Sequence, residues 1–160
     1  MKPPAATAQT LDAGKQRLRT WLKMLKATRL VEAHIREKLR SEFGSTLPRF
    51  DVMAALDRHA DGLTMSALSA ALRVSNGNVT GIVARLVSDA VALRVAVAGD
   101  KRATLVVLTK RGRLLFAHMA AAHQLWIDGL FEAVTPLANG QVQGAMDLVG
   151  APRAREGRKT

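Results

Sequence analysis

The chain has 160 residues, 48% of them hydrophobic, which is enough for one domain with a substantial core or for two small lobes. Its 24 Lys and Arg against 13 Asp and Glu give a net charge of +11, which predicts an anionic partner, with nucleic acid favoured over an acidic membrane surface. The absence of Cys excludes disulfides, thiolate catalysis and Cys-based zinc sites. No apolar run approaches the roughly 20 residues of a membrane span, and no secretory signal opens the chain, so we expect a cytoplasmic protein without a membrane partner.

The first part of the chain predicts one long basic helix. Residues 1–10 show no periodicity and are expected to be a disordered leader. From Leu11 to Phe43 a helical apolar stripe recurs, and nine Lys and Arg against four Asp and Glu make its open face positive. The stripe consists of Leu18, Trp21, Leu22, Leu25, Val31, Ile35, Leu39 and Phe43.

Two shorter helices are predicted next. The second begins at Leu47-Pro48, where proline suits a first turn, and its inward residues are Phe50, Met53, Ala54 and Leu56. After the turn signal Asp61-Gly62, Thr64 is placed to cap a third helix. Its inward residues are predicted to be Leu68, Ala71 and Leu72.

A fourth helix, beginning after Ser75, is the most informative segment. One face has helical spacing of apolar residues: Val79, Ile82, Val83, Leu86 and Val87. The other face is small or polar, with Gly77, Gly81, Ala84 and Ser88 flanked by Asn76, Asn78, Thr80 and Arg85. A helix with this second face can approach a partner closely, and in so basic a chain we predict that the partner is DNA in its major groove.

The periodicity then changes from helix to strand. Residues 91–98 alternate in the manner of a strand, Gly99-Asp-Lys-Arg102 forms a tight charged turn, and residues 103–108 supply a second strand. Thr109 is placed to cap a long fifth helix with an apolar side of Leu114, Leu115, Met119, Ala122, Leu125, Trp126 and Leu130. Pro136 opens a last helix with Val142, Ala145, Met146 and Val149 inward, and residues 151–160 are expected to be a basic disordered tail. The order predicts a mainly α fold with a small β-hairpin wing, the winged helix-turn-helix arrangement.

Four motifs, in order and at suitable spacing, resemble the multiple antibiotic resistance regulators (MarR), a family of bacterial transcription factors. They are Leu-Thr-Met-Ser-Ala-Leu at 63–68, Val-Ser-Asn-Gly-Asn-Val-Thr at 74–80, Arg94 followed by Asp100-Lys-Arg102, and Leu-Thr-Lys-Arg-Gly at 108–112. The resemblance covers roughly Leu18 to Val149. It implies a homodimer in the bacterial cytoplasm, associated with the nucleoid, with interlocked terminal helices between two winged lobes.

The resemblance also implies roles for individual residues. Those expected to contact DNA are Ser75, Asn76, Gly77, Asn78, Thr80, Gly81 and Arg85 from the fourth helix, and Lys101 and Arg102 from the wing, with Arg102 entering the minor groove. Asp100 matches an acid that pairs with a neighbouring arginine, here Arg94, and shapes the wing. Two departures are Gly81, where many relatives have a long basic residue, and Lys101, which cannot form the bidentate fork of an arginine.

A ligand pocket is expected between the first, second and fifth helices, where a basic group beside an apolar slot suits an aromatic carboxylate or a thioester carrying phosphates. The candidate residues are Trp21, Arg29, His34, Arg49, Phe50, Met53, Met119 and His123. The alternative is that the apolar members are core and the arginines are solvated or paired. The wording of residues 75–81 is similar to a subset of the family that controls breakdown of aromatic acids and responds to free acids or their CoA thioesters.

We therefore predict a ligand-responsive regulator, a repressor, that binds a pseudo-palindromic operator as a homodimer. Residues 47–112 are expected to be the DNA-binding domain, and 11–46 with 113–150 the helical dimerisation region. No catalytic motif, metal cluster or cofactor site is recognisable, and His118 and His123 are spaced five apart, which suits a shared metal ion poorly. The alternatives are a ligand-independent architectural DNA-binding protein, distinguished by its ratio of specific to non-specific affinity, and a ligand-binding enzyme or carrier on the same scaffold, distinguished by turnover.

Overall fold

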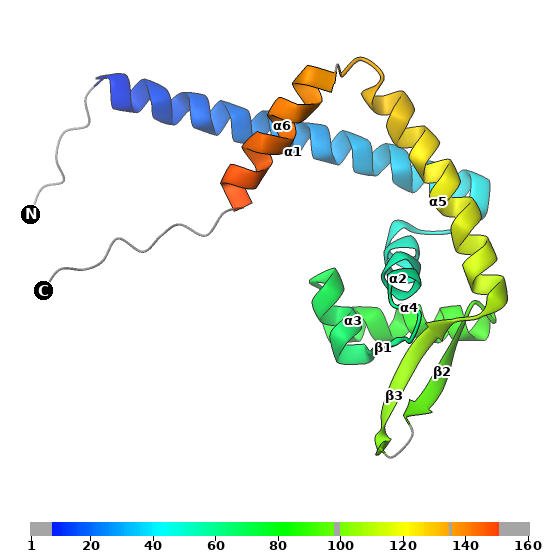
Figure 1. Cartoon of the computed structure of the whole chain (residues 1–160). Helices are drawn as coiled ribbons and strands as arrows, with labels where there is room; N and C mark the ends of the chain where they lie inside the picture. Colours follow the sequence, from blue (N-terminus) through cyan, green and yellow to red (C-terminus); the bar gives the residue numbers. More distant parts are fainter. Residues whose placement is uncertain (1–7, 98–99, 135, 151–160) are drawn as a thin grey trace, which may run out of the picture.

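The computed structural model describes residues 8–97, 100–134 and 136–150. Three helices, Ala8–Phe43, Lys110–Phe131 and Pro136–Gly150, form an arm that is joined to a winged lobe (Figure 1). The elements follow the chain as α1 (Ala8–Phe43), α2 (Leu47–Arg58), β1 (Leu63–Thr64), α3 (Met65–Leu72), α4 (Asn76–Ser88), β2 (Ala92–Val97), β3 (Asp100–Leu108), α5 (Lys110–Phe131) and α6 (Pro136–Gly150). Helices α2, α3 and α4 form the lobe with the sheet, and α5 leads from it back towards α1 (Figure 1). The predicted fold class, mainly α with a β wing, is confirmed.

The first two helices are separated by a short turn with defined capping. Gly44 has φ +57°, the left-handed conformation that ends many helices, and its amide donates to the Arg40 carbonyl at 3.1 Å. Thr46 then caps α2, because its hydroxyl accepts from the amide of Arg49, and Pro48 lies in the first turn as expected. The long C-terminal half of α1 is thereby turned back against α2.

The helix-turn-helix follows the predicted sequence signals. The Thr64 hydroxyl accepts from the Ala67 amide at 3.2 Å, so the predicted cap of α3 is confirmed. Helix α3 ends at Arg73, whose φ of 54° is left-handed, and the Val74 amide donates to the Ser69 carbonyl at 3.2 Å. This tight turn sets the direction in which the chain leaves α3 and enters α4.

The sheet has three antiparallel strands in the order β1-β3-β2, one more than the hairpin that was predicted. Strand β1 pairs through Leu63 with Val106 and through Thr64 with Leu105. Gly62 precedes it with φ +92°, and an added Cβ would lie 2.9 Å from the Val106 carbonyl oxygen, so the chain requires glycine there. The last strand begins at Asp100 rather than 103.

Thr109 joins three elements at the base of the wing. Its amide donates to the Val91 carbonyl at 3.0 Å, and its hydroxyl donates to the Ala90 carbonyl at 2.9 Å. The same hydroxyl accepts from the Gly112 amide at 2.9 Å, which confirms the predicted cap of α5. An added Cβ at Gly112 would collide with the Val91 carbonyl oxygen, so the Leu-Thr-x-x-Gly motif is a close contact between α5 and the start of the wing.

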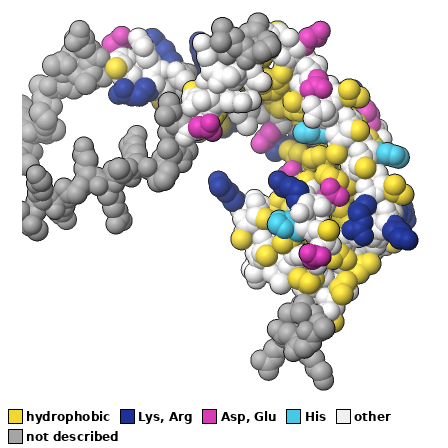
Figure 2. Space-filling view, in the orientation of Figure 1, with side chains coloured by type: hydrophobic (Ala, Val, Ile, Leu, Met, Phe, Trp, Pro, Cys, Tyr) yellow, Lys and Arg dark blue, Asp and Glu magenta, His cyan; other side chains and the backbone are white. Residues whose placement is uncertain are grey.

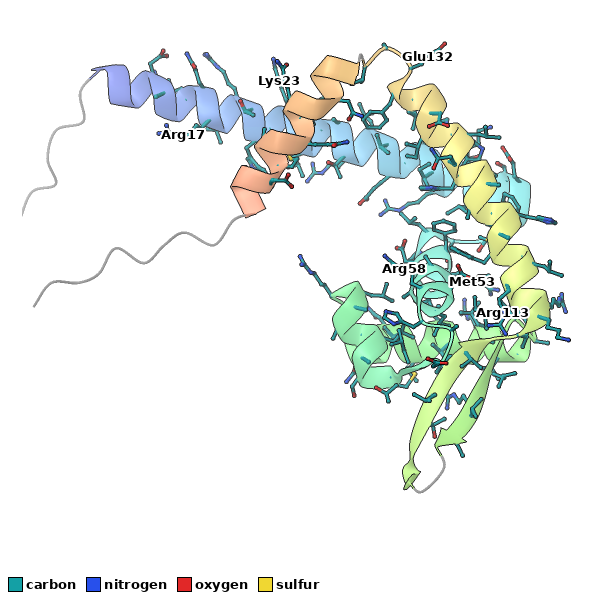
Figure 3. The ribbon with its side chains drawn as sticks, in the orientation of Figure 1. Arg17, Lys23, Met53, Arg58, Arg113 and Glu132 are labelled. Atoms are coloured by element: carbon teal, nitrogen blue, oxygen red, sulfur yellow. The ribbon has the colours of Figure 1, made fainter. Side chains whose placement is uncertain are left out.

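The core lies in the lobe and in the adjoining parts of α1 and α5. Met53 is 1% exposed, and its side chain points from α2 towards α5 (Figure 3). The expectation for α3 was wrong at one position: Ala71 is exposed, and Ser69 is buried instead. The other buried apolar side chains include Ile35, Leu39, Phe50, Val52, Leu56, Leu68, Val79, Val83, Leu86, Val106, Leu108 and Met119.

The arm exposes much of its apolar surface in the single chain. Leu125 of α5 is 70% exposed and Val149 of α6 is 75% exposed. The prediction that the apolar residues of α6 point inward was therefore wrong for the single chain, because little of the chain packs on that helix. Figure 2 shows hydrophobic side chains open to solvent on both the arm and the lobe. The other exposed apolar residues of the arm include Leu18, Trp21, Leu22, Leu114, Leu130, Val142 and Met146.

None of the helices in the described part of the chain combines the length and the apolar composition needed to cross a bilayer.

Candidate nucleic-acid interface

Helix α4 is anchored by one face and open on the other. Val79, Val83 and Leu86 are fully buried, as the spacing predicted. Ser75 has the extended backbone of a capping residue, but its side chain makes no capping hydrogen bond in the described structure. The Thr80 hydroxyl donates to the Asn76 carbonyl at 2.8 Å, which leaves its lone pairs available to an external donor.

The open face carries the residues that were predicted to contact DNA. An added Cβ at Gly77 or Gly81 would meet nothing within 4 Å, so neither glycine is required by packing inside the chain. A glycine inside a helix costs about 1 kcal/mol relative to alanine. Gly14, Gly129, Gly140 and Gly144 are equally open, so what distinguishes Gly77 and Gly81 is the row of polar side chains beside them. The exposed members of this face are Asn76, Gly77, Asn78, Thr80, Gly81 and Arg85.

The wing extends from the lobe on the side away from α1 (Figure 1). Arg94 is exposed and lies opposite Val106 in the register of β2 and β3. Strand β3 includes the backbone of Asp100, Lys101 and Arg102, whose side chains lie outside the described residues. The predicted pairing of Asp100 with Arg94 and the predicted contact of Arg102 with DNA therefore remain predictions.

Arg49, for which ligand binding stays a prediction, links the start of α2 to the end of α4. Its Nη2 donates to a carboxylate oxygen of Asp89 at 2.7 Å, with 23% of the arginine side chain and 48% of the aspartate side chain exposed. Its Nε is buried without a hydrogen-bond partner. The sequence carried no signal for this ion pair, because the two residues are 40 positions apart and lie on different helices.

A hollow of about 330 Å³ adjoins this ion pair. Arg49 and Thr46 from α2 line it, together with residues from the open side of α4: Gly77, Asn78, Gly81, Ile82 and Arg85. We call it the Arg49–Arg85 hollow. It brings two guanidinium groups from different helices to one concave surface next to the open glycines.

A larger groove of about 590 Å³ runs between α2, the end of α3 and α4. Burial of its carboxyl raises the pKa of Asp51 above the ordinary value, and the charge of Glu32 raises it further, whereas His123 and Arg36 lower it. A carboxylate in the lining repels an anion, so this groove does not favour an anionic ligand. The groove is lined by Thr46, Pro48, Asp51, Leu72, Val74, Asn78 and Ile82, and thus by none of the predicted ligand residues.

Part of the predicted ligand set does come together where α2 meets α5. The rings of Phe50 and His123 stack with centroids 5.0 Å apart, and Phe116 lies 5.5 Å from Phe50. Met53 and Met119 are buried in the core. In the single chain these side chains fill the space between the helices.

The remaining predicted ligand residues lie on α1, away from Phe50. Trp21 lines a hollow of about 490 Å³ that also includes Val149 of α6. Arg29 lines a separate hollow of about 260 Å³ with Leu22 and Leu25, and His34 is exposed. The structure does not gather the eight candidates into one cavity. In residues 8–97, 100–134 and 136–150, no group of three His, Asp or Glu side chains is arranged to hold a metal ion.

The comparisons with known proteins agree on one family. A sequence profile of the MarR family matches residues 43–103. A MarR family transcriptional regulator from Silicibacter pomeroyi is 33% identical, with a TM-score of 0.73 over 86% of this chain and 95% of that one. A search of curated protein sequences found no match.

Two solved complexes share the fold at lower identity. A mutant of the Escherichia coli regulator MarR, complexed with operator DNA, is 22% identical with a TM-score of 0.74, and the match covers 85% of this chain and 96% of that one. Sco3205 from Streptomyces coelicolor, a MarR family transcriptional regulator in complex with DNA, is 21% identical with a TM-score of 0.75, covering 92% and 89%. On the profile match and the 33% identity over nearly the whole length, this chain belongs to the MarR family of transcriptional regulators.

Proposed function

We propose that the protein is a transcriptional repressor that binds a pseudo-palindromic DNA operator as a homodimer. The observation that carries the proposal is the open face of α4, where Gly77 and Gly81 have free space above them and polar side chains on either side. Two relatives of the same fold were solved with DNA bound. In a dimer, two such helices would enter successive major grooves about 34–36 Å apart.

Within this face we assign different tasks to the side chains. Asn76 and Asn78 read base edges, because an amide offers a donor and an acceptor that match adenine. Thr80 contacts phosphate once its hydroxyl proton turns from the Asn76 carbonyl to a phosphate oxygen, and Arg102 of the wing enters the flanking minor groove. The lobe of residues 47–112 thus binds DNA, while residues 11–46 and 113–150 form the dimer.

The effector in this proposal is a small aromatic acid or its CoA thioester, which releases the operator. Such a ligand acts only through a difference in affinity for two arrangements of the lobes, so it must favour a spacing that misfits the operator. The site lies at the junction of α1, α2 and α5, completed by the partner copy. A gel-shift titration with benzoate, hydroxycinnamates and their CoA thioesters tests this class, and release by none of them contradicts it.

The proposal is tested by measuring affinity for the chain's own upstream DNA and for scrambled duplexes at one salt concentration. We expect the specific site to bind roughly a thousandfold more tightly. A ratio close to one would identify an architectural protein instead. In vitro transcription from the bound promoter then separates repression from activation.

A further inference from the structure

The Arg49–Arg85 hollow contains two cations and only one neighbouring acid among the described residues. Asp89 accepts from Nη2 of Arg49 at 2.7 Å, whereas the described structure gives the side chain of Arg85 no hydrogen bond or ion pair. The net charge at the hollow is therefore positive. An oxyanion is the ligand that would neutralise it.

The orientation of Arg49 supports the same conclusion. The Nε of Arg49 is buried without a hydrogen-bond partner, so a ligand in the hollow would meet the outer nitrogens of the guanidinium and not this atom. Asp89 accepts from Nη2, which lies beside Nε on the same edge of the guanidinium, so the planar group is fixed while the donors of Nη1 remain available. Asp89 is half exposed and belongs to the C-terminal end of α4, so it orients Arg49 without filling the hollow.

The floor of the hollow favours a phosphate of DNA over a small free anion. Gly77 and Gly81 expose the helix backbone, and nothing in the chain occupies the space above them. Without side chains at these two positions, a duplex can approach the helix backbone closely. The hollow lies at the edge of the open face of α4, where a helix in the major groove is flanked by the DNA backbone.

We infer that Arg49 and Arg85 together hold one backbone phosphate of the bound duplex, with Asp89 as the positioning residue for Arg49. This inference rests on the proposed function and deepens it, because it adds a DNA contact from α2 to those of α4 and the wing.

The test is the salt dependence of operator binding by the full-length protein, since each neutralised phosphate contributes a slope of about 0.9 in a plot of log affinity against log salt. The variants are Arg49→Gln, Arg85→Gln and the double variant, with thermal unfolding as a check of the fold. The homodimer has two such hollows, so we expect each single variant to reduce the slope only in part and the double variant to reduce it by about 1.8. A double variant with an unchanged slope, or with a loss of about 3.6, which indicates two separate phosphates in each protomer, overturns the inference.

Two further variants test whether the change in slope belongs to this hollow. Lys23→Gln removes a cation from the arm, on the side of α1 away from the lobe, and should leave the slope unchanged (Figure 3). Asp89→Asn keeps both cations but releases the Arg49 guanidinium, so it should weaken operator binding and reduce the slope by no more than Arg49→Gln does; unchanged affinity and slope would remove Asp89 as the positioning residue. Wild-type protein that binds no duplex overturns the proposed function as well, whereas normal binding with an unchanged slope in the double variant overturns this inference alone.

A titration with sodium benzoate, followed by NMR at the Arg49 Nε, distinguishes the source of the anion. We expect no saturable shift at this atom. A saturable shift, together with unchanged salt slopes in the variants, would assign the hollow to a small carboxylate and overturn its assignment to DNA.

Discussion

Gly112 and Gly81 both lie in helices, but the fold requires glycine only at position 112. At Gly112 a side chain would collide with the Val91 carbonyl, so the residue is required by the fold. At Gly81 a side chain would meet nothing, so the residue lowers stability without any gain inside the chain. Selection for an external contact accounts physically for the second case.

We predict that Gly81→Ala raises the free energy of unfolding by about 0.5–1 kcal/mol, because alanine favours the helix, and weakens operator binding, because its methyl group stands between the helix and DNA. Urea denaturation and fluorescence anisotropy with a labelled operator measure the two effects. Gly112→Ala is the matched control and should destabilise the protein by about 1–3 kcal/mol through overpacking. Undiminished operator affinity in Gly81→Ala would contradict close approach at this position.

The buried residues of α4 could be predicted from spacing alone, because a helix anchored on one side repeats every 3.6 residues. The ion pair of Arg49 with Asp89 could not, because it depends on how two helices cross. The same limit applies to the ligand set: Phe50 and His123 meet, but Trp21 and Arg29 lie along α1 in separate hollows.

At the scale of elements, the ends of helices were more predictable than the edge of the sheet. Thr64 and Thr109 cap the helices that follow them, because each hydroxyl accepts a hydrogen bond from the amide three residues later in the chain. Strand β1 is two residues long, too short for any alternation to appear, and it forms only because Leu63 and Thr64 lie beside β3. Tertiary contact, and not local preference, creates that strand.

Thr109→Ala tests the junction of α5 with the wing. The variant loses the hydroxyl that accepts from the Gly112 amide and donates to the Ala90 carbonyl, and we expect a loss of about 1–2 kcal/mol in the free energy of unfolding. Thr109→Ser keeps the hydroxyl and should recover most of it. Equal stabilities of the alanine and serine variants in urea denaturation would show that the cap contributes little.

At the scale of the whole molecule, the apolar residues of the arm exceed what one chain can bury. Leu125, Val142 and Val149 are exposed although each lies on the apolar stripe of its helix. Periodicity predicts which face of a helix is apolar, but it does not say whether that face packs within the chain or against a second copy. This is why the inward assignment of α6 was wrong for the single chain.

We predict that Leu125→Glu shifts the protein from dimer to monomer, because it places a charge in the apolar face that a second copy would cover. Sedimentation equilibrium measures the association, and the melting temperature of the wild type should rise with protein concentration, as expected for coupled folding and assembly. Leu93→Glu alters an exposed leucine of the wing and should leave the association unchanged. A fully dimeric Leu125→Glu variant would place the interface elsewhere.

Because Thr109 ties the end of α4, the start of β2 and the first turn of α5 to one another, the lobe must follow any tilt of α5 as a single piece. Helix α5 has 22 residues and so acts as a lever about 33 Å long, along which a tilt of only 5° displaces the far end by about 3 Å. In the proposed dimer, a movement of this size at the arm would change the distance between the two α4 helices, so that they no longer match two successive major grooves.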